Sequence, residues 1–383
     1  MRQINAAWLR SKAAQTVITM LTGSGHQAYF VGGCVRNELL NTPVVDVDIA
    51  TDAVPDRVEE LAELSGLKSI PTGKEHGTIT VVSHGKAYEI TTFRRDATTD
   101  GRRAVVAFSS LIIEDASRRD FTMNALYAGA DGKVSDPLEG LPDLTAGRVR
   151  FIGDAGQRIK EDYLRILRFF RFYALYGAEE IGIDADGLAA CALHADGLEN
   201  LAKERIGAEM IKLLDAPNPA PACASMERVG ILARILPGAA SAGLAVLVHV
   251  EMQAGLSPDW LRRLAILGGE DVARSLRLSR AHADRLDILT KNFAGSVHLP
   301  ELAYRQGADA ATSVAVLRAA TFGSELAVDL ADKINAAANS VFPVNAADLM
   351  PKLQGPQLGA RLKQIEADWI ASGFTATKSD LLG

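Results

Sequence analysis

The chain has 383 residues, of which 48% are hydrophobic and 23% charged, and its formal net charge is −6. This length allows two or three domains, each with its own hydrophobic core. The acidic balance argues against nucleic-acid binding over the whole surface, although it is compatible with a local basic track.

Neither membrane insertion nor secretion is indicated by the sequence. No stretch approaches the ~18 consecutive apolar residues of a membrane helix, and residues 4–21 are typical of an amphipathic helix rather than a signal peptide. Cys34, Cys191 and Cys223 are far apart and lack metal-ligand spacing, which indicates reduced core residues. We therefore expect a cytoplasmic protein with no membrane partner.

The first chemical signal is a glycine pair after a short apolar strand. Residues 29–31 predict this strand, and Gly32-Gly33 predicts a turn into a helix. Such a turn lets backbone N–H groups approach an anion, and the helix N-terminus adds partial positive charge. Arg36, about one turn into the helix, can contact the same phosphate. Alone, the glycine pair is weak support, because tight turns use it widely.

The second signal is a carboxylate pair in the segment 44–50, Val-Val-Asp-Val-Asp-Ile-Ala, which predicts a buried β-strand. Asp46 and Asp48 would share a face, about 6–7 Å apart, while the valines face the core. Two adjacent carboxylates are costly unless a divalent cation offsets them, and oxygen ligands suit Mg²⁺. The alternative is a strand end exposed to solvent. Following the glycine turn, this pattern predicts a triphosphate cradle facing a two-metal site.

Further α/β elements follow. Pro55 predicts the start of a helix over 55–65, and residues 78–82 and 87–93 predict a hairpin. Glu89 becomes the third carboxylate of the site if its strand lies beside that of the aspartates, and is otherwise an exposed strand residue. Residues 94–104 lack a hydrophobic period and predict a mobile polar loop. This loop is either a solvated connection or a segment that moves over the nucleotide.

These residues resemble a known family. Val31-Gly-Gly-Cys-Val-Arg36 followed by Asp46-Val-Asp48-Ile-Ala-Thr51 is similar to the first motif of class II tRNA nucleotidyltransferases and bacterial poly(A) polymerases. The resemblance implies an α/β nucleotidyltransferase (polymerase-β-like) N-terminal domain followed by an all-α C-terminal region. Asn37 stands where the family usually has Asp. We do not expect the fold or the metal site to depend on this change, because Asn keeps the acceptor oxygen.

Residues 117–126, Ser-Arg-Arg-Asp-Phe-Thr-Met-Asn-Ala-Leu, resemble the second motif of the family. We expect a helix to begin near Ser117, with two arginines in its first turn, where the dipole disfavours them and an anion would offset the cost. Arg119 and Arg118 are therefore candidate triphosphate ligands, and Asp120 and Asn124 are expected to tie the helix to the sheet. Residues 136–144 resemble the third motif, which we interpret as a hinge or packing segment.

From about residue 147 the chain is predicted to be helical, and residues 148–172 are locally basic. Residues 161–172 resemble the fourth motif, in which Asp162, Arg165, Arg168 and Arg171 follow at three-residue steps. Each step turns back about 60° on a helix, which makes Asp162 and Arg165 neighbours on one edge. A surface salt bridge is the alternative explanation of that pair.

Residues 198–209 resemble the fifth motif, whose Glu204, Arg205 and Glu209 are expected to clamp the Asp162 helix. The later helices show no catalytic pattern. We predict a catalytic domain over 1–147, a nucleotide-selecting helical domain over 148–215 and a helical tRNA-binding region over 216–383.

The predicted chemistry is nucleotidyl transfer to an RNA 3′ end. Asp46 and Asp48 would hold two Mg²⁺ ions with support from Glu89. The triphosphate would be bound by Gly32, Gly33, Arg36, Arg118 and Arg119, and further nucleotide contacts are expected from Asp162, Arg165, Arg168 and Arg171.

Base selection is expected from the protein itself. An Asp162 acceptor beside an Arg165 donor matches cytosine and adenine and mismatches uracil and guanine. The resemblance implies addition of C, C and A to the tRNA 3′ end from CTP and ATP, without an obligate protein partner. A poly(A) polymerase is the first alternative. A non-catalytic RNA-binding protein on the same fold is the second, although both aspartates are present.

Overall fold

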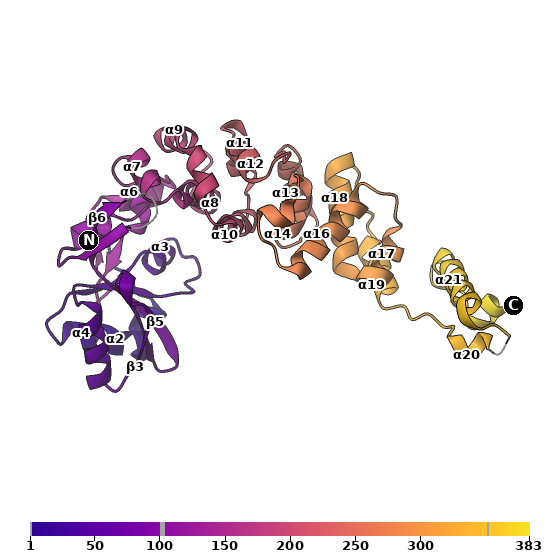
Figure 1. The fold of residues 1–383 in the computed structure, drawn as a ribbon, viewed down its shortest axis with the longest axis horizontal. Helices are drawn as coiled ribbons and strands as arrows, with labels where there is room; N and C mark the ends of the chain where they lie inside the picture. Colours follow the sequence, from indigo (N-terminus) through magenta and orange to yellow (C-terminus); the bar gives the residue numbers. More distant parts are fainter. Residues whose placement is uncertain (1, 100–103, 351) are drawn as a thin grey trace. The chain divides into compact units, whose positions relative to one another are not determined.

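The computed structural model describes residues 2–99, 104–350 and 352–383, without the side chains of 96–99 and 104–106. The chain forms two compact units (Figure 1). The first comprises Met1–Leu213 and Arg228–Arg234, and the second Leu214–Glu227 and Ile235–Gly383. The expected domain boundaries at 147 and 215 stay predictions.

The first unit contains a seven-stranded sheet in the order β3-β4-β5-β2-β1-β8-β9. Neighbouring strands are antiparallel except β2 and β5, which are parallel. The strands are β1 (Ala28–Val31), β2 (Asp48–Thr51), β3 (Lys68–Gly73), β4 (Thr78–Ser83), β5 (Lys86–Thr92), β8 (Tyr127–Ala128) and β9 (Val134–Ser135). The predicted hairpin is confirmed as β4–β5. It turns at His84 and Gly85, whose φ angles of 49° and 76° suit a tight two-residue turn.

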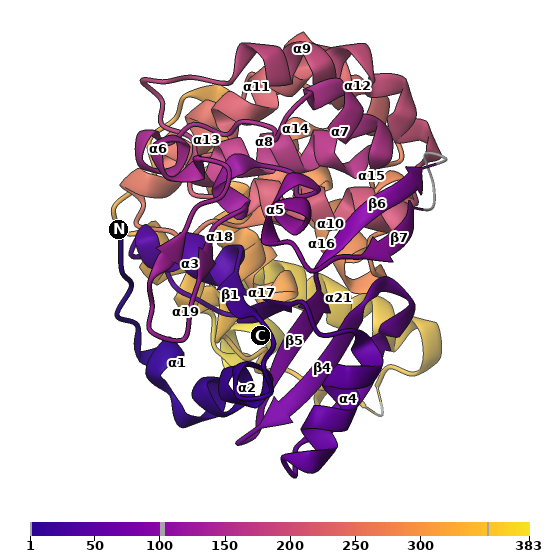
Figure 2. The same ribbon diagram turned by 90° about the vertical axis from the view of Figure 1, so that its left-hand side faces the viewer.

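Helices cover this sheet and supply its core. They are α1 (Ala7–Arg10), α2 (Lys12–Thr22), α3 (Gly33–Leu39), α4 (Pro55–Leu64), α5 (Ile112–Ser117) and α6 (Gly140–Ala146). Both α2 and α4 pack against β4 (Figure 2). The predicted helix over 55–65 is confirmed, with Pro55 in its first turn. The predicted N-terminal helix is interrupted at Ser11, which has extended backbone and accepts a hydrogen bond from Ala14.

The predicted strand over 44–50 is wrong in its first half. Strand β2 begins only at Asp48, and Val45 is 86% exposed rather than in the core. The reason is the register with β1, which ends at Val31 opposite Asp48. Beyond that pair the chain of β1 turns into α3, so residues 44–47 have no partner strand there.

The predicted loop over 94–104 is also wrong for most of its length. Strands β6 (Arg94–Thr99) and β7 (Ala104–Phe108) form a separate antiparallel pair. The apolar partner strand lies mainly beyond residue 104, so the segment taken alone showed no β pattern. Residues 100–103 lie outside the described residues.

The rest of the first unit is helical, as predicted. Its helices are α7 (Ala155–Glu161), α8 (Leu164–Tyr176), α9 (Ala185–Leu193), α10 (Lys203–Leu214) and, in the segment 228–234, most of α12 (Ile231–Ile235). Helix α8 buries Phe169 and Phe172, which contact Phe121 at ring-centroid distances of 6.3 and 4.9 Å. These rings fix α8 to the segment that follows α5.

The second unit is helical throughout its described residues. Its helices are α11 (Ala220–Arg228), α13 (Leu244–Gln253), α14 (Trp260–Leu267), α15 (Val272–Ser275), α16 (Arg280–Phe293), α17 (Leu299–Gln306), α18 (Ala308–Phe322), α19 (Leu330–Ala338), α20 (Ala346–Leu349), α21 (Gly355–Ala371) and α22 (Lys378–Leu382). Helix α18 is capped by Gly323, whose left-handed backbone has φ 66°. No helix among the residues described has the length and apolar character to cross a membrane.

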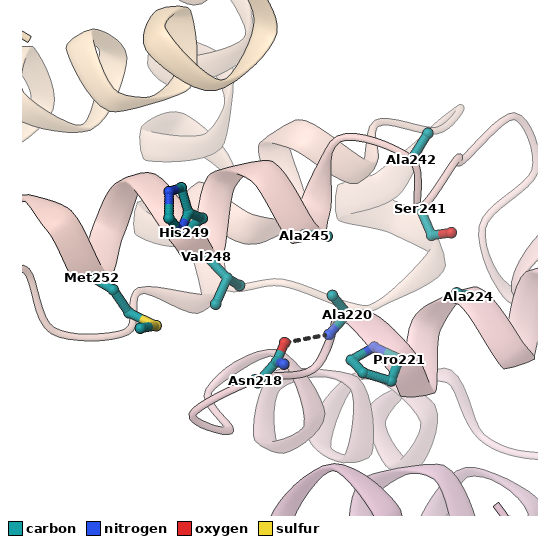
Figure 3. A pocket seen from close by; sticks show the side chains of 10 residues that line it. All are labelled: Asn218, Ala220, Pro221, Ala224, Ser241, Ala242, Ala245, Val248, His249 and Met252. Atoms are coloured by element: carbon teal, nitrogen blue, oxygen red, sulfur yellow. Dashed lines mark hydrogen bonds between the residues drawn. The ribbon is translucent and has the colours of Figure 1, made fainter. Parts of the chain in front are cut away.

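A shallow pocket of about 530 Å³ lies between α11 and α13 of the second unit (Figure 3). Its walls are mostly small or apolar side chains, such as Ala220, Ala245 and Val248, with His249 and Asn218 as polar members. It contains no carboxylate and no arginine, so it lacks the groups that nucleotidyl transfer requires.

Candidate active site

The glycine turn has a backbone that favours Gly at its first position. Gly32 has φ 71° and ψ −119°, which L side chains rarely adopt, and it directly precedes α3. A Cβ at Gly32 would lie 3.3 Å from Nη1 of Arg119 and 3.7 Å from the carbonyl oxygen of Asn124. The Arg119 guanidinium therefore lies next to the Gly32 turn.

Two of the predicted carboxylates lie side by side on the sheet. Asp48 of β2 is paired in register with Glu89 of β5, which confirms the strand adjacency expected from the sequence. Burial, the charge of Glu89 and then the charge of Asp46 raise the pKa of Asp48 to about 6, against the opposing effect of Arg119. Glu89 and Asp46 thus both act electrostatically on Asp48.

A divalent cation fits this donor set. No three His, Cys, Asp or Glu side chains within the described ranges are close enough to hold a metal ion by themselves. Mg²⁺ sites characteristically use one or two carboxylates, with waters and substrate phosphates as the other ligands. Asp48 and Glu89 supply such a pair, and the exposed Asp46 precedes Asp48 by two residues.

The two arginines of the second motif do not begin a helix, and this expectation is wrong. Helix α5 ends at Ser117, and Arg118 is its C-terminal cap, where positive charge is favoured. Helix α5 begins at Ile112, five residues before the predicted start at Ser117. Arg118 and Arg119 therefore lie near the negative end of a helix dipole.

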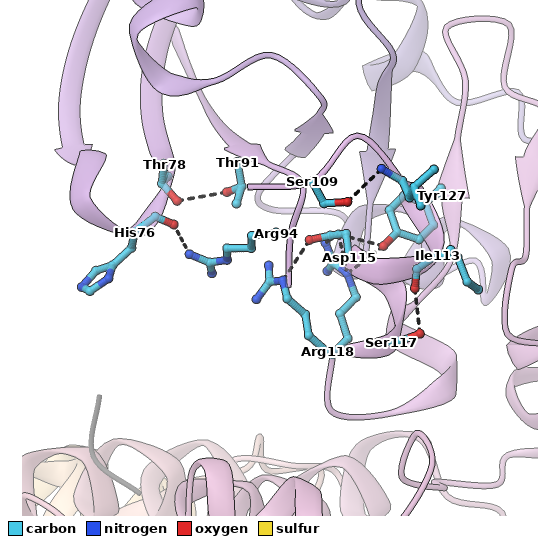
Figure 4. Close-up of polar contacts among 12 residues, drawn as sticks. His76, Thr78, Thr91, Arg94, Ser109, Ile113, Asp115, Ser117, Arg118 and Tyr127 are labelled. Carbon is cyan, nitrogen blue, oxygen red and sulfur yellow. Dashed lines mark hydrogen bonds and ion pairs between the residues drawn. The ribbon is translucent and has the colours of Figure 1, made fainter. Parts of the chain in front are cut away.

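A buried aspartate, Asp115, orients both arginines, and Figure 4 shows it beside Arg118 and Tyr127. Asp115 is fully buried, and it accepts hydrogen bonds from Nε of Arg118 at 3.0 Å and from Nη2 of Arg119 at 2.9 Å. The hydroxyl of Tyr127 donates to the same carboxylate at 2.8 Å. The two guanidinium charges hold the pKa of Asp115 below its usual range although burial acts to raise it. Nη1 of Arg119 is left pointing toward the Gly32 turn.

Arg36 lies about one turn into α3, as expected, and its side chain is engaged by neighbouring protein groups. Its side chain is buried, and its guanidinium donates to Asn37 Oδ1, to Asn124 Oδ1 and, at 2.8 Å, to the hydroxyl of Tyr176. It also lies over the rings of Tyr176 and Phe172, at 4.2 and 5.1 Å from their centroids. Asn37, the departure from the family pattern, is thus a direct partner of Arg36.

Asp162 and Arg165 do not share a helix, and the predicted side-chain pair is wrong. Asp162 is the extended residue between α7 and α8, where its Oδ1 accepts from the backbone N–H of Leu164 and caps α8. Its Oδ2 instead pairs with Arg205 at 2.8 Å, in agreement with the clamp predicted for the fifth motif. The helix is interrupted at residues 162–163, and the regular three-residue spacing of the charged side chains gave no sign of this interruption.

Arg165 lies in the first turn of α8 and is held from two directions. Its Nη1 pairs with Glu161 at 2.5 Å, and its Nη2 donates to the backbone carbonyl of Arg118 at 3.0 Å. Among the described residues no acceptor contacts its Nε. The helix that carries the predicted base-reading arginine is thereby joined to the segment that carries the predicted triphosphate arginines.

The remaining arginines of α8 are engaged by carboxylates. Arg168 pairs with Asp120, with Nε 2.8 Å from Oδ2, and Arg171 pairs with Glu209 at 2.6 Å. Asp120 also accepts from Asn124 at 2.8 Å, so these two residues connect α8 and α3 rather than tying a helix that begins at Ser117 to the sheet, as was expected. As placed, Arg168 and Arg171 serve protein contacts, and direct nucleotide binding by either stays a prediction.

Sequence reasoning missed four contributors to this site: Asp115, Tyr127, Glu161 and Tyr176. Asp115 and Glu161 each lie four residues before the arginine they hold, Arg119 and Arg165 respectively, and this spacing was available as a signal. The two tyrosines act across elements, so no local spacing points to them.

Comparison with known proteins agrees with the resemblance found in the sequence. Residues 28–150 match the family model described as Poly A polymerase head domain, and residues 181–242 match that described as probable RNA and SrmB-binding site of polymerase A. A CCA-adding enzyme of Latilactobacillus sakei is 35% identical over 295 residues, which cover 76% of this chain and 72% of that protein. The chain belongs to the family of CCA-adding enzymes.

Other family members align over different lengths. A human mitochondrial protein named CCA tRNA nucleotidyltransferase 1 is 41% identical over 207 residues, 54% of this chain and 48% of the relative. The chain spans about half the length of the first curated relatives it matches. The solved structure of the Bacillus stearothermophilus CCA-adding enzyme in complex with CTP has a TM-score of 0.72 and 28% identity, over 94% of this chain and 93% of that one. The fold of this family member is therefore a nucleotidyltransferase head followed by a helical region, as predicted.

Proposed function

We propose that this CCA-adding enzyme family member adds C, C and A to the 3′ end of tRNA from CTP and ATP. The observation that carries the proposal is the in-register pairing of Asp48 with Glu89 beside Arg119, whose charge acts on Asp48. Carboxylates for a cation and a guanidinium for phosphate thus converge at one end of β2. This is the arrangement that nucleotidyl transfer requires.

The reaction joins the RNA 3′-hydroxyl oxygen to the α-phosphorus of the nucleotide. The bond from that phosphorus to the α–β bridging oxygen breaks, and pyrophosphate leaves. Asp46 and Asp48, with Glu89 beside them, would hold divalent cations, which we propose to be Mg²⁺. When bound, such cations lower the pKa of the attacking hydroxyl and neutralise the developing phosphate charge.

The protein's own residues orient the triphosphate. Arg119 directs Nη1 toward the Gly32 turn, because Asp115 holds its Nε and Nη2. A fixed guanidinium has little conformational freedom left to lose when phosphate binds. Arg118 is held by the same carboxylate and can add a second charge-assisted contact.

Base selection is proposed for Asp162 and Arg165, although they do not pair with each other. Each oxygen of Asp162 has one protein donor and keeps further acceptor capacity. Arg165 keeps its Nε–H and one Nη2 hydrogen beyond its contacts within the described chain. An acceptor and a donor thus remain for the amino group and ring nitrogen that cytosine and adenine share.

Poly(A) polymerase activity is the second candidate, because the matching head-domain model is described by that name. One assay separates the two candidates and tests the metal. The protein is incubated with tRNA that lacks its 3′ CCA, with each nucleotide singly and with CTP and ATP together, with Mg²⁺ or EDTA. Extension by three residues that EDTA abolishes supports the proposal. An open ladder of A would assign the alternative, and no extension would remove the proposed activity. A cytoplasmic location stays a prediction of the sequence.

A further inference from the structure

Arg36 is a buried cation whose direct partners in the described chain are neutral. Four of its five N–H donors are engaged: Nε and Nη2 with Asn37, Nη1 with Asn124, and Nη2 with Tyr176. No carboxylate of the described residues lies within ion-pair distance of this guanidinium. Breaking these bonds to bind phosphate would leave several buried polar groups unpaired, which is costly.

The partners of Arg36 belong to three different parts of the first unit. Arg36 itself is on α3, directly behind the Gly32 turn, and Asn124 lies in the segment that also places its carbonyl oxygen against Gly32. Tyr176 is the last residue of α8. A single side chain therefore connects the predicted phosphate turn with the far end of the predicted base-reading helix.

Earlier turns of α8 are joined by arginine contacts to the segment that follows α5. The first turn of α8 is held by Arg165, which donates to the carbonyl of Arg118, and its middle by Arg168, which pairs with Asp120. Two side-chain hydrogen bonds of described residues join the end of α8 to α3: Arg36 donates to the Tyr176 hydroxyl at 2.8 Å, and that hydroxyl donates to Asn37 Oδ1 at 3.4 Å.

We propose that Arg36 and Tyr176 are positioning residues that set the separation between the triphosphate turn and the base-reading helix, and that Arg36 is not a phosphate ligand. This inference rests on the proposed function. An enzyme that chooses bases without a template must hold the base and the α-phosphorus at a fixed distance, because the reacting atoms have to approach within about 3–3.5 Å. A looser α8 would still bind nucleotide but would hold it in productive geometry less often.

The main test variant is Tyr176→Phe, which removes the hydroxyl but keeps the ring under the guanidinium. Tyr173→Phe is the matched control, because Tyr173 is on the same helix and its hydroxyl has no hydrogen-bond partner among the described residues. We expect Tyr176→Phe to lower kcat about tenfold for both C and A addition, with KM for each nucleotide within about twofold of wild type. Tyr173→Phe should match wild type in both constants. Equal kcat values for the two variants would overturn the proposal, as would a loss of thermal stability without a change in kcat.

Arg36→Lys separates positioning from phosphate binding. Lysine keeps the charge but lacks the planar fork of the guanidinium, so it can reproduce neither a bidentate phosphate contact nor three partners at once. We expect an unchanged Kd for inorganic tripolyphosphate with Mg²⁺, a lower kcat, and no further loss in the double variant Arg36→Lys/Tyr176→Phe, because the two residues act as one unit. A weaker tripolyphosphate Kd, or additive losses, would contradict the inference.

These outcomes are distinct from failure of the proposed function. If the wild-type protein transfers no nucleotide to tRNA, the proposed function fails. The tripolyphosphate Kd of Arg36→Lys then still decides whether Arg36 is a phosphate ligand, because that measurement needs neither tRNA nor transfer.

Discussion

Among single residues, Asp48 is the carboxylate on which most of the proposed chemistry depends. We expect Asp48→Asn to reduce transfer below a few per cent of wild type at saturating Mg²⁺, because Asn lacks the charge needed to bind the cation. The fold should persist and its thermal midpoint should not fall, since the change removes a charge that burial and Glu89 disfavour. Asp46→Asn is expected to have the same effect on transfer.

The control for these variants is Asp131→Asn, which changes an exposed aspartate whose partner is Lys133. It should keep the wild-type rate, because exposed ion pairs contribute little. Primer-extension rates and thermal melting of all three variants check the prediction. Retention of more than a few per cent of the rate by Asp48→Asn would disprove its role as a metal ligand.

Asp162 offers a second test at one side chain. We predict that Asp162→Ala relaxes base choice, so that UTP or GTP is incorporated at a larger fraction of the CTP rate. Arg205→Gln removes the ion-pair partner of Asp162 but keeps its carboxylate, and it should therefore keep the selectivity. The measured quantity is the ratio of kcat/KM for CTP to that for UTP. A loss of stability with unchanged selectivity in Asp162→Ala would make the residue purely structural.

Local sequence patterns identified the candidate site residues better than the residues that contact them. Asp48 and Glu89 were expected on neighbouring strands, and the sheet register confirms this adjacency, whereas Arg119 was named on a helix start that the structure places elsewhere. The roles of Arg36 and Tyr176 could not be read in the same way. Their contact joins residues 140 positions apart, so it depends on how α8 packs against α3.

Secondary-structure elements were also predicted incorrectly where two local sequence signals conflict. The valines before Asp48 favour a strand, but strand pairing requires a partner, and β1 has already turned at Gly32. The arginines after Ser117 suggested a helix start with an anion, whereas the apolar Ile112 and Ile113 belong to a helix that ends there. Helices and hairpins whose signals agree, such as α4 and β4–β5, were predicted within one or two residues.

The β6–β7 hairpin replaces the predicted loop but keeps its proposed role. Its base is attached to the head, since Arg94 donates to the backbone carbonyl of His76 (Figure 4) and the Ser109 N–H donates to the carbonyl of Phe93 at 2.8 Å. In the proposed function, the same two residues, Asp162 and Arg165, must accept a one-ring base twice and then a two-ring base. Hydrogen bonding alone does not set that order, so another element has to change the shape of the pocket.

We predict that replacing residues 96–102 with a short Gly-Ser turn leaves C addition nearly normal and strongly slows addition of the final A. Single-turnover rates of C onto tRNA ending before CCA, and of A onto tRNA ending in CC, measure the effect. The control is His84→Asn, which keeps a two-residue Asn-Gly turn in the β4–β5 hairpin and should change neither rate. An equal loss in both rates would require the switching role to be abandoned.

In the molecule as a whole, each compact unit contains its own buried ionic network. In the first unit the arginines of α8 and the segment after α5 are neutralised by Asp115, Asp120 and Glu209. In the second unit Glu251 of α13 is fully buried and pairs with Arg262 and Arg263 of α14, at 2.7 and 2.9 Å. Because the two arginines share the single Glu251 carboxylate, one of the two guanidinium groups needs further hydrogen-bond acceptors.

Arg263 obtains those acceptors from the segment that enters the second unit. Its Nη1 donates to the carbonyl of Leu214 at 2.7 Å and to that of Ala216 at 2.5 Å, and its Nη2 donates to that of Pro217 at 3.2 Å. Leu214 ends α10, so its carbonyl has no partner within the helix. The guanidinium thus joins α13, α14 and residues 214–217 inside the second unit.

We predict that Arg263→Met lowers the free energy of unfolding of the second unit by about 3–5 kcal/mol, because the carbonyls of the buried Leu214 and Ala216 and part of the Glu251 charge lose their partner. Arg234→Met is the control: its ion pairs with Asp196 and Glu199 are exposed, and their loss should cost less than about 1 kcal/mol. Denaturant unfolding of both variants gives the comparison. The Kd for CTP should stay within about twofold of wild type in Arg263→Met, because all proposed nucleotide contacts lie in the first unit. A loss below 1 kcal/mol would show that water replaces the guanidinium at these carbonyls, and a large change in CTP affinity would show that the anchor acts on the catalytic unit as well.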